Sequence, residues 1–123
     1  MMVVAVVEDN ADNRLLLQAI LDGLYDVHEY ENAEAALAAF GRAAPDVVLL
    51  DISLPGMSGV ELVERLRADD ALRHVPVIAL TAHAMAGDRE SYLAAGFDAY
   101  VTKPIVDEGV LLRTIDRLAT RSR

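Results

Sequence analysis

Cysteine is absent from the 123-residue chain, which also lacks a basic leader and any long apolar run. Without cysteine the protein has no disulfide framework, no thiolate nucleophile and no cysteine-ligated zinc. Met1 and Met2 lead directly into an apolar segment, and no apolar run reaches the length that a bilayer requires. We therefore expect one cytoplasmic domain over residues 1–123, with no membrane association.

Basic side chains are also scarce. The chain has 11 Lys and Arg residues against 20 Asp and Glu residues, which gives a formal charge of −9. Such a balance repels nucleic-acid phosphates and favours solubility, cations or basic partner surfaces. We therefore predict that the protein binds no nucleic acid.

Strand-like and helix-like segments alternate along the chain with short connections. Strand composition is found at residues 3–7, 25–30, 47–51, 77–81 and 99–102. Helical spacing of apolar residues is found at about 12–24, 33–40, 60–67, 88–95 and 107–120. This alternation is typical of a parallel sheet with crossover helices. The 25–30 segment is more polar than the other strands, which favours the edge of the sheet.

Two of these helices carry specific expectations about which side chains face the core. The 12–24 helix, with Asn10 or Asp12 as its cap, is predicted to bury an apolar face that consists of Leu16, Leu17, Ile20, Leu21 and Leu24. The 60–67 helix is predicted to expose an outer charged face that consists of Glu61, Glu64, Arg65 and Arg67.

Four of the five predicted strands end in polar side chains. These are Glu8 and Asp9 after the first strand, Asp51 after the third, Thr81 after the fourth and Lys103 after the fifth. In open parallel sheets, ligands bind outside the carboxyl ends of the strands. If the sheet is parallel, all five groups therefore lie at one edge and form a candidate site.

The order and spacing of these groups resemble the receiver domain of response regulators in two-component signalling. The Lys103-Pro104 pair and Tyr100, three residues before the lysine, extend a resemblance that covers essentially the whole chain. The 51–59 segment and the 81–88 run look most like single-domain cell-cycle regulators and receivers of hybrid kinases. The resemblance implies a flavodoxin-like (βα)5 receiver fold, with a doubly wound five-stranded parallel sheet in the order 2-1-3-4-5.

The resemblance also implies that Asp51 is a phosphoacceptor. Asp51 would take a phosphoryl group from a histidine kinase or a histidine phosphotransfer protein, and Lys103 and Thr81 would assist as catalytic residues. The protein is then a signalling protein that catalyses only its own phosphorylation and dephosphorylation, not an enzyme. Its further partner would be a downstream protein target, with the chain a monomer or a weak phosphorylation-dependent dimer.

Three crowded carboxylates repel one another unless a cation compensates their charge. An oxygen-only ligand set suits a hard ion such as Mg²⁺. The resemblance implies that Asp9, Asp51 and the backbone carbonyl of Ser53 ligate this ion, with Glu8 acting partly through water. Glu8 stands where the family often has aspartate. The glutamate keeps the negative charge, but its longer side chain can change the geometry around the metal ion.

The remaining expectations concern switching, lifetime and docking. The resemblance implies that Thr81 and Tyr100 form the switch that alters the protein-binding surface. Ser53 and His83 lie two residues beyond Asp51 and Thr81 and are candidates for setting the lifetime of the acyl phosphate. The residues predicted to dock the upstream partner are Ala11, Arg14, Leu15, Pro104 and Ile105.

Three other classes of protein deserve comparison. A phosphate hydrolase of the aspartyl-phosphate type usually has a second carboxylate two residues after the nucleophile, where this chain has Ser53. A flavodoxin-type carrier needs a phosphate-binding loop where this chain has Glu8 and Asp9. An interaction module that turns over no phosphate would lack Asp51, Lys103 or one of the acidic residues after the first strand. This chain has all of them. We expect no output domain, and therefore either a stand-alone regulator that acts by binding proteins or a receiver excised from a larger hybrid kinase.

Overall fold

The computed structural model describes residues 1–82, 87–103, 105 and 107–121, with side chains described through Ala119. Its strands are β1 (Val3–Val7), β2 (Asp26–Tyr30), β3 (Val47–Asp51), β4 (Val77–Thr81) and β5 (Ala99–Thr102). Its helices are α1 (Ala11–Leu21), α2 (Ala33–Phe40), α3 (Gly59–Ala68), α4 (Asp88–Ala95) and α5 (Glu108–Arg121). None of the helices described is long and apolar enough to cross a membrane.

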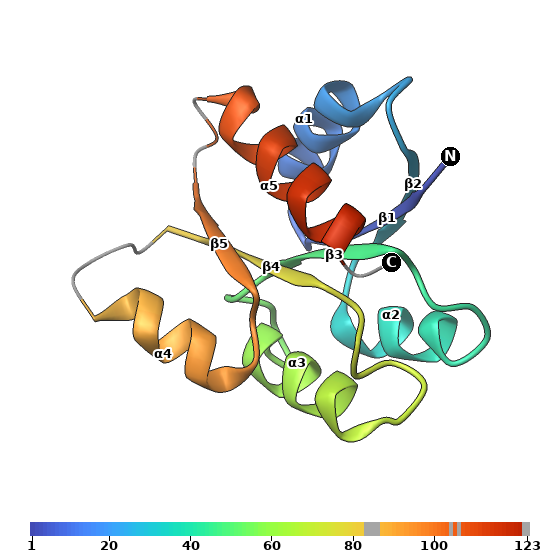
Figure 1. Cartoon of the computed structure of the whole chain (residues 1–123), viewed down its shortest axis with the longest axis vertical. Coiled ribbons are helices and arrows are strands. Elements are labelled where there is room, and N and C mark those ends of the chain that lie inside the picture. Colours follow the sequence, from blue (N-terminus) through green and yellow to red (C-terminus); the bar gives the residue numbers. More distant parts are fainter. Residues whose placement is uncertain (83–86, 104, 106, 122–123) are drawn as a thin grey trace.

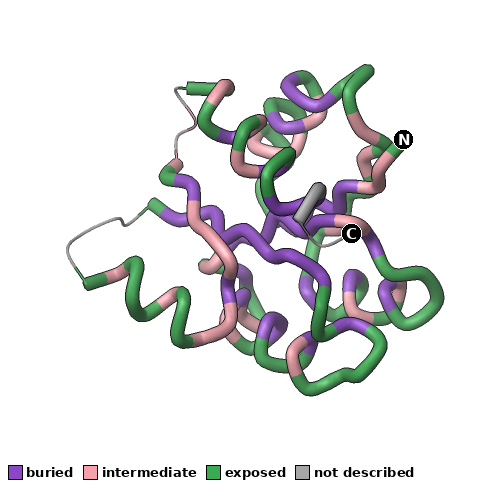
Figure 2. Tube along the Cα trace, in the orientation of Figure 1, coloured by how far each residue is buried: buried purple, intermediate pink, exposed green. Residues whose placement is uncertain are grey.

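The strands form one parallel sheet in the order β2-β1-β3-β4-β5, with β2 and β5 at its edges. Helices α1 and α5 cover one face, and α2, α3 and α4 cover the other (Figure 1). Each face buries its own apolar cluster, and the central strands are buried on both sides (Figure 2). The predicted fold and strand order are therefore confirmed.

Helix α1 is shorter than the sequence predicted. Asn10 caps it by accepting a hydrogen bond from the Asn13 N–H at 3.0 Å. The helix ends at Leu21, and Gly23 then turns the chain with a φ of 79°. The prediction that Leu16 and Leu24 face the core is wrong, because these side chains are 41% and 54% exposed. The core face of this helix consists of Leu17, Ile20 and Leu21.

The prediction for the outer face of α3 is wrong at Arg67. Glu61, Glu64 and Arg65 are exposed, but the Arg67 side chain lies against the protein. Its guanidinium pairs with Asp98 at 2.8 Å and donates to the carbonyl oxygen of Val75 at 2.7 Å. Arg67 therefore connects the end of α3 with the segments that enter β4 and β5.

Gly59 allows α3 to begin directly against the end of β3. A Cβ atom at this position would lie 2.5 Å from the Asp51 carbonyl oxygen and 2.9 Å from the Ile52 Cα. Both neighbours are backbone atoms, which cannot rotate away. The close approach of helix to strand therefore depends on the absence of a side chain, and it fixes the backbone at Asp51.

Gly59→Ala is expected to destabilise the protein by about 1–3 kcal/mol, because the added methyl group overpacks this contact. Urea denaturation measures the effect as a change in the free energy of unfolding. Gly41→Ala is the matched control, since its Cβ would meet its nearest neighbour at 3.5 Å and its φ is −65°. We expect the control to stay within about 0.5 kcal/mol of the wild type. Equal stability of both variants would contradict the close contact.

Candidate functional site

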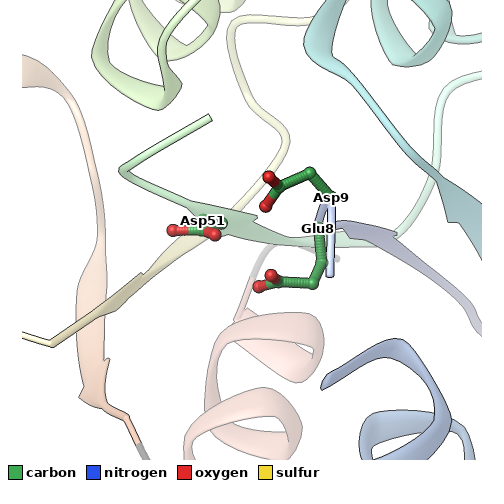
Figure 3. A group of neighbouring side chains, drawn as sticks. All are labelled: Glu8, Asp9 and Asp51. Carbon is green, nitrogen blue, oxygen red and sulfur yellow. The ribbon is translucent and has the colours of Figure 1, made fainter. Parts of the chain in front are cut away.

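Three carboxylates meet at the carboxyl ends of β1 and β3 (Figure 3). Glu8 and Asp9 follow β1, Asp51 ends β3, and one oxygen of each lies within 4.8 Å of the others. The pairing of Val7 with Leu50 brings these strand ends together. Glu8 and Asp51 are 1% and 3% exposed, whereas Asp9 is open to solvent.

Lys103 reaches the same point from β5. Its Nζ lies 3.1 Å from Oδ2 of Asp51 and 3.5 Å from Oε2 of Glu8. The Lys103 N–H also donates to the carbonyl oxygen of Thr81 at 2.7 Å, which fixes the chain where it leaves the sheet. The sequence predicted that these groups lie at one edge of the sheet, and in the structure Glu8, Asp9, Asp51 and Lys103 form one cluster there.

Burial and repulsion between like charges dominate the electrostatics of this pocket. Burial, and then the negative charge of Asp51, raise the pKa of Glu8 despite hydrogen bonds from Asn13 and Asn10 and the charge of Lys103. Burial alone would lower the pKa of Lys103, but its hydrogen bond to Asp51 and the charges of Asp51 and Glu8 raise it overall. The lysine therefore stays protonated.

The donor set fits a hard divalent cation. When all three carboxylates are ionised, their charge and that of the Lys103 ammonium sum to −2, which an ion of charge +2 neutralises. All three side chains offer oxygen, the ligand that Mg²⁺ prefers. The Ser53 N–H donates to Oδ1 of Asp51 at 2.9 Å, so the Ser53 backbone also lies beside the cluster.

Thr81 ends β4 and is buried beside this pocket. Its Oγ1 lies 2.9 Å from the phenol oxygen of Tyr92, a residue of α4. The ring of Tyr92 lies 5.9 Å from the ring of Tyr100, measured between centroids. The sequence reasoning missed Tyr92, because α4 buries no residue fully and gives a weak helical pattern.

The predicted docking residues differ in their surroundings. Ala11 and Leu15 are exposed on α1, with Leu15 69% exposed, and Ile105 packs partly against the core. The Arg14 side chain is only 14% exposed and donates to the Glu8 carbonyl oxygen at 2.8 Å. His83 and Pro104 lie outside the described residues.

The doubly wound fold and the cluster of three carboxylates and a lysine at its strand ends agree with the receiver architecture that the sequence implied. Residues 4–116 match the family model of the response regulator receiver domain. The chain belongs to this family, and it is a signalling protein rather than a conventional enzyme.

Known proteins similar to this chain include both single-domain and longer members. The polar-differentiation response regulator DivK of Brucella anthropi is 43% identical over 103 residues, which cover 83% of this chain and 84% of DivK. The sensor protein GacS of Pseudomonas syringae pv. syringae is 43% identical over 106 residues, which cover 83% of this chain but only 12% of GacS.

A solved structure supports the same comparison. The receiver domain of sensor histidine kinase PA1611 from Pseudomonas aeruginosa PAO1 has a TM-score of 0.87 and 35% sequence identity. The similarity covers 97% of this chain and 98% of that domain. That structure holds a magnesium ion in its active-site cleft.

Proposed function

We propose that Asp51 accepts a phosphoryl group from the phosphohistidine of a kinase or phosphotransfer protein, and that the resulting acyl phosphate alters a protein-binding surface. The observation that carries the proposal is the setting of Asp51. Its carboxylate is buried, hydrogen-bonded to Lys103 and close to the carboxylates of Glu8 and Asp9. Such a constellation stabilises a transferring phosphoryl group by charge and position.

The proposed metal ligands are Asp9, Asp51 and the backbone carbonyl of Ser53, with Glu8 contributing through water. When bound there, Mg²⁺ neutralises the carboxylates and the charge that develops on the phosphoryl oxygens. The exposed side of Asp9 leaves the cluster accessible from solvent.

The proposed transfer step is an in-line displacement. An oxygen of Asp51 forms the new O–P bond while the N–P bond of the phosphohistidine breaks, and the imidazole nitrogen keeps the electron pair. Lys103 donates to one phosphoryl oxygen, and the Thr81 hydroxyl donates to another. The Lys103 Nζ already contacts Oδ2 of Asp51, and Thr81 ends the strand that pairs with β3, next to Leu80, the partner of Asp51.

The proposed output is a shift between two conformations rather than a second reaction. Thr81 and Tyr100 form the switch, and Ser53 and His83 set the lifetime of the acyl phosphate. The upstream partner docks beside α1 and the loop after β5, on Ala11, Arg14, Leu15, Pro104 and Ile105. The exposure of Leu15 supports a contact with an apolar partner surface. The downstream partner is a protein, and the chain is a monomer or a weak dimer that forms on phosphorylation.

Incubation with acetyl phosphate tests the proposal, with intact mass as the readout. We expect one phosphoryl adduct in Mg²⁺ and none in EDTA, because the carboxylates then lack their counter-charge. Hydroxylamine should remove the adduct, as expected for an acyl phosphate. An unchanged mass in both buffers would favour an interaction module, and rapid consumption of unrelated phosphate esters would favour a hydrolase.

A further inference from the structure

The hydrogen bond between Thr81 and Tyr92 is not used by the phosphoryl-transfer proposal above. It joins the hydroxyl that ends β4 to a phenol on α4, with 2.9 Å between the two oxygens. Thr81 is buried, and its backbone carbonyl is held by the Lys103 N–H at 2.7 Å. With the backbone held there, a neighbouring group can control the rotation of the Thr81 side chain and the direction of its hydroxyl proton.

The ring of Tyr92 is held in place on two sides. Phe97 meets it edge to face at 6.2 Å and 80°, and Tyr100 lies tilted against it at 5.9 Å and 55°. A tyrosine side chain has few rotatable bonds, so these contacts also fix the position of its hydroxyl. The phenol is therefore an anchored partner for Thr81.

Proton count decides the direction of this hydrogen bond once a phosphoryl group is present. A threonine hydroxyl has one proton to donate and lone pairs that accept. An ionised phosphoryl oxygen can only accept, so Thr81 must give its proton to that oxygen. The contact with Tyr92 then persists only if the phenol O–H is the donor.

We infer that Tyr92 is a positioning residue for Thr81: its phenol donates to Thr81 Oγ1 and directs the Thr81 proton toward the phosphoryl group on Asp51. The inference rests on the proposed function. The two hydrogen bonds, from Tyr92 to Thr81 and from Thr81 to the phosphoryl oxygen, then run in the same direction. Each polarises the other and strengthens it. Since Tyr92 belongs to α4 and contacts Tyr100 of β5, the same bond links the occupied pocket to these two elements.

Tyr92→Phe tests the inference, because it removes the hydroxyl and keeps the ring that packs on Phe97 and Tyr100. We expect the initial rate of Mg²⁺-dependent phosphorylation by acetyl phosphate to fall about threefold to tenfold, the effect of one neutral hydrogen bond. Tyr25→Phe is the matched control, since Tyr25 lies next to the amino end of β2, at the opposite end of the sheet. The control is expected to keep the wild-type rate.

Combination with variants of Thr81 separates positioning from a general structural effect. In a Thr81→Ala background, Tyr92→Phe should cause no further loss of rate. In a Thr81→Ser background, which restores a hydroxyl, it should again slow the reaction. Equal slowing with and without the Thr81 hydroxyl would overturn the inference.

The wild-type sample distinguishes failure of the inference from failure of the proposed function. An adduct that forms at the same rate in the wild type and in Tyr92→Phe overturns the role of Tyr92 alone. The absence of any adduct in the wild type overturns phosphoryl acceptance and, with it, the role of Tyr92. Thermal unfolding of each variant confirms that the compared samples are folded.

Discussion

Replacement of Asp51 by asparagine is expected to abolish the phosphoryl adduct. The amide oxygen can still accept the hydrogen bond from the Ser53 N–H, now at 2.9 Å, so the loop after β3 keeps its anchor. The amide carries no full negative charge, and it therefore neither attacks phosphorus effectively nor compensates a divalent cation. Intact mass after incubation with acetyl phosphate and Mg²⁺ measures the loss.

Asp46→Asn is a matched control next to the same strand. Asp46 directly precedes β3, and its Oδ2 accepts from the Val3 N–H at 2.7 Å, at the amino ends of β1 and β3 and so at the opposite end of these strands from Asp51. This variant removes one carboxylate charge but is expected to keep the full adduct. A full adduct on the Asp51 variant would show that another side chain receives the phosphoryl group.

Replacement of Arg67 by methionine is expected to destabilise the protein by about 2–4 kcal/mol. The guanidinium donates to the carbonyl oxygens of Gly96, Arg73 and Val75 at 2.9, 3.0 and 2.7 Å, and it pairs with Asp98 at 2.8 Å. Methionine keeps the apolar stem and removes all four of these interactions. About a quarter of each charged side chain remains exposed, so solvent screening places the effect below the simple sum of the bonds.

Urea denaturation of Arg67→Met and of a neighbouring variant isolates this contribution. Arg65→Met is the control, since Arg65 lies in the same last turn of α3 but is exposed. The control is expected to change the free energy of unfolding by no more than about 0.5 kcal/mol. Comparable losses in both variants would indicate a general effect of charge on the helix rather than a specific network.

The sequence predicted a parallel sheet, because β1, β3 and β4 are apolar on both faces and short turns separate the strands from the helices. The order of the strands followed from the family resemblance. The edge position of β2 followed from its polarity. The exposure of Leu16 and Leu24 could not be predicted from spacing alone. Leu24 lies beyond the end of α1 at Leu21, so helical spacing no longer sets its direction. Leu16 lies within α1, beside the core face that Leu17, Ile20 and Leu21 form, and its side chain stays 41% exposed.

The strand-end carboxylates could be predicted as a group because parallel strands bring their ends to one edge. The positions of Asp51, Glu8 and Lys103 at the strand ends were enough to predict that these side chains lie close together. The contacts of Tyr92 with Thr81 and of Arg67 with Asp98 could not be predicted, because each long side chain reaches another part of the fold. Arg67 does lie four residues after the buried Val63, and this helical spacing was the available signal for its position.

The topology of the sheet also has a kinetic consequence. Every strand pairing is parallel, so no two strands can join through a tight hairpin, and a helix separates each consecutive pair. The pairing of Val4 with Val47 closes a loop that contains α1, β2 and α2. Loop-closure entropy is therefore lost before the sheet gains its bonds. The chain is accordingly expected to fold more slowly than a helical bundle of the same length, whose contacts have low contact order.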